Sequence, residues 1–184
     1  YLAELLLKKN YSVHGIVRRV ALEDQSHRLW RIKGILKKIN LHSASLESYA
    51  SIVKIIQKVK PHEIYHLGAQ SYVSYSFEDE FSTLNTNING THYLLSAIKD
   101  FSPKTKFYFA ASSEMFGKVR ETPQNELTPF HPRSPYGISK VAAEDVLKNL
   151  CELNNIEWVI AVPHNIIGPR QIYSDPYRNV VSIF

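Results

Sequence analysis

Apolar residues recur along the chain with two different spacings, and the two kinds of segment alternate. The short apolar or alternating runs, which predict β-strands, cover residues 12–17, 63–69, 106–111 and 158–162. The segments with helical spacing cover residues 1–10, 46–59, 84–98 and 136–153. Strands separated by helices need crossover connections. The sequence therefore predicts an α/β fold with a doubly wound, mostly parallel sheet of the Rossmann type.

A proline-rich stretch separates the third predicted strand from the helix at residues 136–153. Four of the nine prolines fall between Pro123 and Pro135, which excludes regular structure there. Ser134 is a favoured N-cap and Pro135 suits the first helical position, so a helix is expected to begin at this point. Because ligands of open α/β sheets bind at the carboxyl ends of strands, the loop is expected to form one wall of a ligand site.

Composition narrows the class of protein. The chain has 184 residues, of which 44% are hydrophobic and 21% charged, as in an ordinary globular domain. No apolar run reaches the roughly 20 residues of a membrane span, and no secretory leader is recognisable. The single cysteine, Cys151, suits a reducing compartment, so a cytoplasmic location is expected. The net charge is +5, and its basic residues are scattered along the chain, which suits a basic surface or a small anionic ligand. Neither nucleic acid nor a membrane is expected as a partner.

One motif matches the sequence pattern of a metal site, but its predicted secondary structure does not suit metal binding. Residues 62–66 read His-Glu-Ile-Tyr-His, the pattern of zinc proteases, which needs a helix. Pro61 precedes the run and its composition favours a strand, on which His62 and His66 would lie about 13 Å apart. The ligands of one zinc ion cannot be so far apart, so no metal site is predicted.

Tyr136 and Lys140 are the first candidates for chemistry. They lie four positions apart at the start of a predicted helix and therefore share a face. A phenol with a pKa near 10 is a poor base at neutral pH, and a neighbouring cation favours the phenolate. We therefore expect Lys140 and the helix N-terminus to lower the pKa of Tyr136. The spacing alone is weak evidence, because a solvated tyrosine and lysine would show it too.

Two further polar segments are expected at the same edge of the sheet. Ser112, Ser113 and Glu114 follow an apolar strand, and residues 67–71, Leu-Gly-Ala-Gln-Ser, end an earlier one. The small residues in the second segment would let a flat ring approach the backbone. Alternatively, the hydroxyls only satisfy backbone groups at the strand end.

Together, these segments resemble the extended short-chain dehydrogenases/reductases, in the branch of nucleotide-sugar epimerases and dehydratases, and most of all the GDP-mannose 4,6-dehydratases. The similar stretches are residues 1–4, 13–19, 63–71, 112–117 and 132–137. The resemblance implies an NADP-dependent lyase that acts on a nucleotide sugar, GDP-mannose, and makes a 4-keto-6-deoxy sugar by internal hydride transfer from C4 to C6. It also implies a homo-oligomer, either a dimer or a tetramer.

The resemblance implies a role for each matching residue. Tyr136 would take the proton of the sugar 4-hydroxyl, Ser112 would hydrogen-bond that oxygen, and Glu114 would remove the C5 proton. Lys140, with Tyr136, would contact the nicotinamide ribose. The other expected contacts are Leu67 and Ala69 for the cofactor, and Ser71, Glu114, Asn165 and Arg178 for the substrate.

Glu114 separates two reactions. A 4-epimerase needs only the serine, tyrosine and lysine, because it leaves C5 untouched, whereas a dehydratase needs a base for C5. Glu114 could instead contact a sugar hydroxyl or form a structural salt bridge. A UDP-sugar 4-epimerase therefore stays open as an alternative, and so does a non-catalytic NADP-binding module.

Arg18 and Arg19 follow the first predicted strand. In these folds an acidic residue at that place binds the ribose of NAD, whereas arginine accommodates the 2′-phosphate of NADP. NADP is therefore expected in preference to NAD. Two solvated arginines after a strand are the alternative explanation.

Three features depart from the family pattern. The chain has no Gly-x-x-Gly-x-x-Gly phosphate loop, so residues 1–184 are expected to be one partial NAD(P)-binding domain, inactive alone, without the first strand and most of the substrate domain. Ile166 and Gln171 stand where dehydratases have His and Arg. Ser45-Leu46 replaces an Asp-Leu dipeptide that contacts adenine. These differences leave the identity of the sugar nucleotide open.

Overall fold

The computed structural model describes residues 1–164, 166 and 168–170. Its strands are β1 (His14–Val17), β2 (Asn40–Ser43), β3 (Glu63–His66), β4 (Lys106–Ala110) and β5 (Trp158–Ala161). They form two sheets, β1-β2 and β3-β4-β5, and every pair is parallel. The predicted α/β architecture with parallel strands is therefore confirmed.

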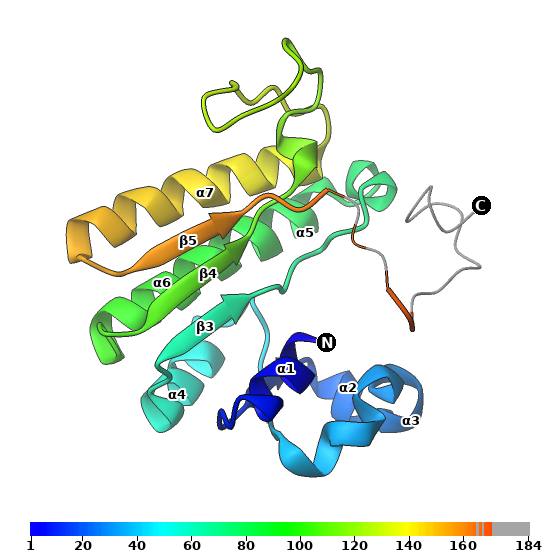
Figure 1. Cartoon of the computed structure of the whole chain (residues 1–184), viewed down its shortest axis with the longest axis vertical. Helices are drawn as coiled ribbons and strands as arrows, with labels where there is room; N and C mark the ends of the chain where they lie inside the picture. Colours follow the sequence, from blue (N-terminus) through cyan, green and yellow to red (C-terminus); the bar gives the residue numbers. More distant parts are fainter. Residues whose placement is uncertain (165, 167, 171–184) are drawn as a thin grey trace.

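Apart from α1, which precedes β1, the helices lie between consecutive strands of the chain. They are α1 (Leu2–Lys8), α2 (Arg19–Glu23), α3 (Gln25–Arg28), η1 (Trp30–Lys38), α4 (Tyr49–Val59), η2 (Ser74–Phe77), α5 (Glu80–Leu84), η3 (Asn85–Asn89), α6 (Gly90–Phe101), η4 (Ser113–Met115) and α7 (Pro135–Asn154). Figure 1 shows α4, α6 and α7 along the β3-β4-β5 sheet, while α1, α2 and α3, in blue, lie together on the side of the picture away from α7. None of the helices in the described part of the chain is long and apolar enough to cross a bilayer.

The core lies between the β3-β4-β5 sheet and these three helices. Phe107 and Phe109 alternate along β4 onto the covered face and are at most 1% exposed. They meet Leu95 on α6 and Leu147 on α7, each fully buried. Burying a side chain of this size contributes roughly 1.5–3 kcal/mol, so this layer fixes where the carboxyl end of β4 lies.

Several segments differ from the sequence prediction. Residues 19–38, for which no helix was predicted, form α2, α3 and η1. Strand β2 was not predicted, because Asn40–Ser43 is polar and too short to show a period. The helix expected at residues 84–98 is instead α5, a π-helical turn over Asn85–Asn89 and α6. An extra residue in a π-helical turn shifts the helical register, so the apolar spacing predicts a helix there without revealing the break.

The proline-rich excursion begins and ends as expected. Gly117 has a positive φ of 49°, and a Cβ there would collide with the backbone of His131, so the turn after η4 requires glycine. The backbone N–H of His131 donates to Met115 at 3.1 Å and closes the base of the loop. At its far end, Ser134 accepts a hydrogen bond from the N–H of Gly137 at 3.0 Å and caps α7. Figure 1 shows the loop projecting beyond the carboxyl end of β4.

Candidate active site

Ser112 is the second residue after β4 and links two elements. Its hydroxyl accepts the backbone N–H of Glu114 at 3.3 Å and so caps η4. The same side chain lies within hydrogen-bonding reach of the phenol of Tyr136, at the start of α7, and lowers its pKa. The capping role that the sequence left open therefore coexists with a contact to the candidate base.

Tyr136 is 8% exposed, and its protonation is governed by burial. Loss of solvent raises the pKa of its phenol above the ordinary value, and the nearby charge of Glu114 raises that pKa further. The hydrogen bond from Ser112 works in the opposite direction. Ser112 and Glu114 therefore both lie near enough to Tyr136 to influence the protonation of its phenol.

Lys140 lies one turn along α7 and is buried beside the end of β4. Its Nζ donates to the carbonyl of Ala110 at 2.9 Å and lies 4.8 Å from the ring centroid of Phe109 and 5.9 Å from that of Tyr136. Burial lowers the pKa of Lys140 to about 8. Lys140 was expected to lower the pKa of Tyr136, but in this arrangement that pKa is raised. Burial of the phenol outweighs the other influences on it.

Glu114 sits on η4 and is held close to α7. Gly137 makes this approach possible, since a Cβ there would lie 2.7 Å from the carbonyl oxygen of Glu114. Among the residues that the structure describes, none forms an ion pair with Glu114. The alternative of a structural salt bridge therefore finds no support in these contacts.

The other residues predicted to contact the cofactor or the substrate are not joined directly to the residues described so far. Leu67 is 57% exposed, Ala69 is half-buried and Ser71 is exposed, all in the loop after β3. Within the described part of the chain, no hydrogen bond or ion pair joins these three residues to Tyr136 or Lys140. Their roles stay predictions. Asn165 and Arg178 lie outside the described residues.

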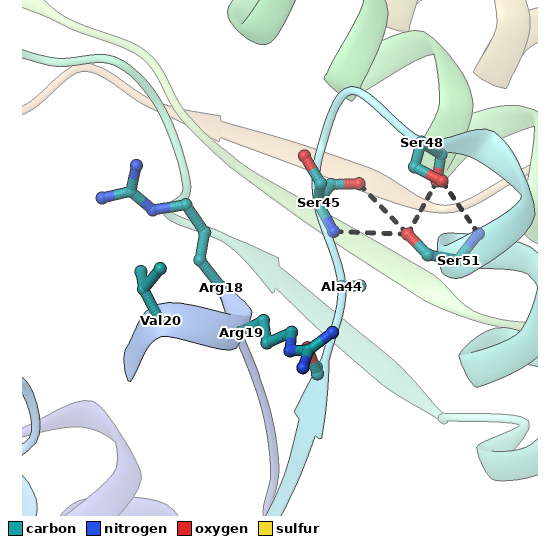
Figure 2. Close-up of a pocket in the computed structure, with 8 residues that line it drawn as sticks. Arg18, Arg19, Val20, Ala44, Ser45, Ser48 and Ser51 are labelled. Atoms are coloured by element: carbon teal, nitrogen blue, oxygen red, sulfur yellow. Dashed lines mark hydrogen bonds between the residues drawn. The ribbon is translucent and has the colours of Figure 1, made fainter. Parts of the chain in front are cut away.

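A separate cavity of about 420 Å³ lies at the carboxyl ends of β1 and β2. Its lining residues, which include no carboxylate, are Arg18, Arg19, Val20, Ser43, Ala44, Ser45, Ser48 and Ser51. Figure 2 shows the guanidinium groups of Arg18 and Arg19 pointing in different directions. Arg19 is paired with Glu23 at 2.9 Å, whereas Arg18 has no ion-pair partner among the described residues.

Hydroxyl groups form the opposite side of this cavity. Ser51 Oγ donates to the carbonyl of Ser48 at 2.9 Å and accepts the backbone N–H of Ser45 at 3.2 Å, as Figure 2 shows. Ser48 caps α4 by accepting the N–H of Ser51. A cavity with two guanidinium groups and neutral hydroxyls suits an anionic ligand.

The residues of the zinc-like motif are placed as the strand prediction requires. Glu63–His66 is strand β3. His66 is 4% exposed, and its Nε2 lies 3.1 Å from Thr91 Oγ1, while His62 is exposed. Searched over the described ranges, the chain has no cluster of three His, Cys, Asp or Glu side chains that could hold a metal ion.

Sequence reasoning missed one buried polar residue of this region. Asn87, in the π-helical turn η3, is 2% exposed and bonds to both Gln70 and Ser139. The sequence signal that could have found it is the set of three alternating asparagines, Asn85, Asn87 and Asn89, which places polar side chains inside an otherwise apolar helical segment.

Comparisons with known proteins place the chain among sugar-nucleotide enzymes. The family model described as GDP-mannose 4,6 dehydratase matches residues 1–184. The chain is 44% identical over 181 residues to GDP-mannose 4,6 dehydratase of Cricetulus griseus. The matched region covers 93% of this chain and 48% of the relative. It is 43% identical over 180 residues to GDP-mannose 4,6-dehydratase of Vibrio cholerae, with 93% and 47% covered. The chain thus spans about half the length of the curated relatives it matches.

Solved structures show the same fold. UDP-glucose 4-epimerase of Thermotoga maritima with UDP-glucose superposes with a TM-score of 0.84 at 25% identity, over 98% of this chain and 56% of that one. RMD from Pseudomonas aeruginosa complexed with NADPH superposes with a TM-score of 0.68 at 30% identity, over 79% of this chain and 52% of that one. The predicted Rossmann-type, partial fold is confirmed by these likenesses.

Proposed function

Because the chain belongs to the GDP-mannose 4,6-dehydratase family, we propose that the whole protein removes water from GDP-mannose and makes the 4-keto-6-deoxy sugar. The observation that supports this most is the convergence of Ser112, Glu114 and Tyr136 at the carboxyl end of β4. A dehydratase needs a base for the C5 proton besides the group that serves the 4-hydroxyl. Glu114, without an ion-pair partner in the described part of the chain, supplies that second group.

Each of these residues has a defined proton task. Tyr136 accepts the proton of the sugar 4-hydroxyl, and Ser112 hydrogen-bonds to the same sugar oxygen. Glu114 then takes the C5 proton, which the neighbouring C4 carbonyl has made acidic, and the C6 hydroxyl leaves as water with the proton that Glu114 took. General acid–base transfer requires each group within about 3 Å of its proton.

Ser112 also acts on Tyr136 before the sugar reacts. Its hydrogen bond is the contact within the described residues that lowers the pKa of the phenol. Burial and Glu114 both raise that pKa, so the tyrosine depends on Ser112 to become the phenolate. The serine thus contributes to activating the base as well as to orienting the sugar.

The residues present fit NADP at two places. Arg18, unpaired among the described residues, suits the 2′-phosphate, and the cavity beside it contains no carboxylate that would repel an anion. Tyr136 and Lys140 are buried together at the end of β4, where they would hold the nicotinamide ribose. When bound, NADP supplies the acceptor and donor of the hydride that moves from C4 to C6. The relationship to RMD, whose structure contains NADPH, supports this choice over NAD.

Product analysis tests the proposal. The whole protein is incubated with NADP and either GDP-mannose or UDP-glucose, and the products are identified by mass spectrometry and nuclear magnetic resonance. Loss of one water from GDP-mannose, with a keto group at C4, is the expected result. An epimerised sugar without loss of oxygen from C6 would contradict it.

A UDP-sugar 4-epimerase is the second candidate. The Thermotoga maritima epimerase superposes on 98% of this chain, and Ile166 departs from the dehydratase pattern. An epimerase has no use for a base at C5, so this reading leaves Glu114 without a chemical task. The same incubation with UDP-glucose distinguishes the two.

The whole protein is further proposed to be a homo-oligomer. Large apolar side chains are exposed on neighbouring elements, with Phe77 at 62%, Phe81 at 80% and Ile138 at 49% exposed. Such a group is typical of a surface that another subunit covers. Sedimentation of the whole protein is expected to give a dimer or tetramer, and a monomer at micromolar concentration would contradict it.

A further inference from the structure

The π-helical turn over Asn85–Asn89 presents an asparagine to the protein interior. Asn87 is 2% exposed, whereas asparagine is mostly found at protein surfaces. Its backbone carbonyl accepts a hydrogen bond from Thr91 Oγ1 at 2.7 Å. Turns of this kind are frequent at functional sites, because they redirect one side chain without ending the helix.

The Asn87 side chain uses both of its amide hydrogens and its oxygen. Oδ1 accepts the backbone N–H of Gln70 at 2.8 Å, and Nδ2 donates to the carbonyl of Gln70 at 3.0 Å and to Ser139 Oγ at 2.9 Å. A backbone N–H can only donate, so the amide has one possible orientation. Asn87 therefore attaches to the loop after β3 and to α7 at the same time.

Ser139 passes this connection on to the candidate base. It is fully buried on α7, between Tyr136 and Lys140 in the sequence. Its single hydroxyl proton goes to the carbonyl of Tyr136 at 2.7 Å, so its oxygen is the acceptor for Asn87. Two side chains thus join the backbone of Gln70 to the backbone of Tyr136.

A second branch reaches β3 from the same asparagine. The single proton of Thr91 Oγ1 is donated to Asn87, so His66 must donate to Thr91 from Nε2, at 3.1 Å. Burial and the charge of Lys140 lower the pKa of His66 to about 3, which agrees with a neutral ring. The network connects β3, α6 and α7 through hydrogen bonds that satisfy each group, and such networks hold their members in one arrangement.

We propose that Asn87 and Ser139 are positioning residues, which set the place of Tyr136 relative to the loop after β3. The proposal rests on the proposed function, because it concerns the tyrosine that serves as base there. Removing the Ser139 hydroxyl leaves one amide hydrogen of Asn87 unpaired and removes the side-chain hydrogen bond to the carbonyl of Tyr136. The first turn of α7 can then shift, which changes the burial that governs the Tyr136 phenol.

Titration of Tyr136 in the whole protein tests this. The ultraviolet difference spectrum between each background and its Tyr136→Phe counterpart isolates this phenol from the other tyrosines. Ser139→Ala is expected to move the Tyr136 pKa toward the ordinary value, since solvent enters. Asn87→Ala is expected to move it the same way, and the double variant no further than the larger single effect, because both changes break one connection.

Asn89→Ala is the matched control. Asn89 lies in the same π-helical turn, but its side chain is half-buried and, among the described residues, bonds to Asn85 at 2.7 Å and not to Gln70 or Ser139. It is expected to leave the Tyr136 titration unchanged. A merely structural role for Ser139 would lower the melting temperature without moving that titration, so a wild-type titration in folded Ser139→Ala overturns the proposal.

Turnover separates the proposal from the proposed function. With GDP-mannose, Ser139→Ala is expected to lower kcat about tenfold and to leave KM within about twofold, because the substrate contacts are intact. If the wild-type protein does not dehydrate GDP-mannose, the proposed function fails, while the Tyr136 titration still decides the positioning role.

Discussion

The hydroxyl of Ser112, just after β4, lies within hydrogen-bonding reach of the phenol of Tyr136, in the first turn of α7. A long proline-rich excursion separates the two residues in the sequence. Because burial and Glu114 both raise the pKa of the phenol, the serine opposes the other influences named for this group. The protonation of the candidate base therefore depends on a neighbour from another element.

Ser112→Ala is expected to raise the Tyr136 pKa, because it removes the hydrogen bond that lowers it. In the pH profile of kcat/KM for the whole protein, the acid limb should move to higher pH, and activity at neutral pH should fall about 100-fold. Ser113→Ala is the control, since among the described residues the neighbouring hydroxyl is not one of the groups that influence the Tyr136 pKa. An unmoved acid limb in Ser112→Ala would contradict the assignment.

Glu114→Gln is expected to abolish dehydration while leaving the fold intact. The amide keeps the shape of the side chain but cannot accept the C5 proton, so turnover should fall by at least about 100-fold. Incorporation of solvent deuterium at C5 of the sugar, followed by nuclear magnetic resonance, should be lost with it. Removal of the Glu114 charge should also lower the Tyr136 pKa, since that charge raises it.

Glu126→Gln serves as the control for Glu114. Glu126 is exposed in the proline-rich loop and makes no ion pair within the described part of the chain. Its variant should dehydrate at the wild-type rate. If Glu114→Gln retained wild-type deuterium exchange at C5, another residue would have to be the C5 base.

The fold was largely predictable because its strands are apolar and its helices are amphipathic. Residues Lys106–Ala110 are buried against helices, and such a strand has the continuous apolar run that predicts it. Strand β2 has no such signal, because three of its four residues are polar and pairing with β1 defines it. The π-helical turn was hidden for a different reason, since one inserted residue changes the direction of a side chain without changing composition.

The site was predictable only as far as residue types and strand ends allow. Tyr136, Lys140 and Ser112 were found because their spacing and their place after β4 match a known pattern. The direction of the Tyr136 pKa shift could not be predicted, since the burial of the phenol depends on how α7 packs against η4. Asn87 was missed because a hydrogen bond between residues far apart in the sequence leaves no local signal.

Arg18→Ala is expected to weaken binding of NADPH more than that of NADH. A charge-assisted hydrogen bond to the 2′-phosphate contributes roughly 1.5–3 kcal/mol, so the Kd for NADPH should rise about tenfold to 100-fold. The Kd for NADH, which has no 2′-phosphate, should change little. Fluorescence titration of the whole protein measures both.

Two further arginines calibrate that result. Arg19→Ala should have a smaller effect, because Arg19 already pairs with Glu23. Arg120 is exposed in the proline-rich loop, so Arg120→Ala should leave both constants unchanged. Equal losses for NADPH and NADH in Arg18→Ala would show that the residue does not read the 2′-phosphate.

Lys140 makes the free energy of unfolding change with pH in the alkaline range. Burial lowers its pKa from 10.5 to about 8, so between these values the unfolded chain binds a proton that the folded chain does not. Stability contributed by this group therefore rises as pH increases from about 8 to 10.5, by an amount bounded at roughly 3 kcal/mol. Below pH 8 the folded state holds a buried ammonium, which is the unfavourable condition.

Lys140→Met removes this dependence in the whole protein without cofactor. Relative to the wild type, the variant should lose stability as pH rises from 8 to 10.5, because only the wild type gains over that window. Urea unfolding at several pH values measures the difference. For Lys54→Met, at an exposed position on α4, the difference from wild type should stay flat over the same range. A flat difference for Lys140→Met as well would mean that the ammonium is solvated in the folded protein, and the buried arrangement with Ala110 would then be wrong.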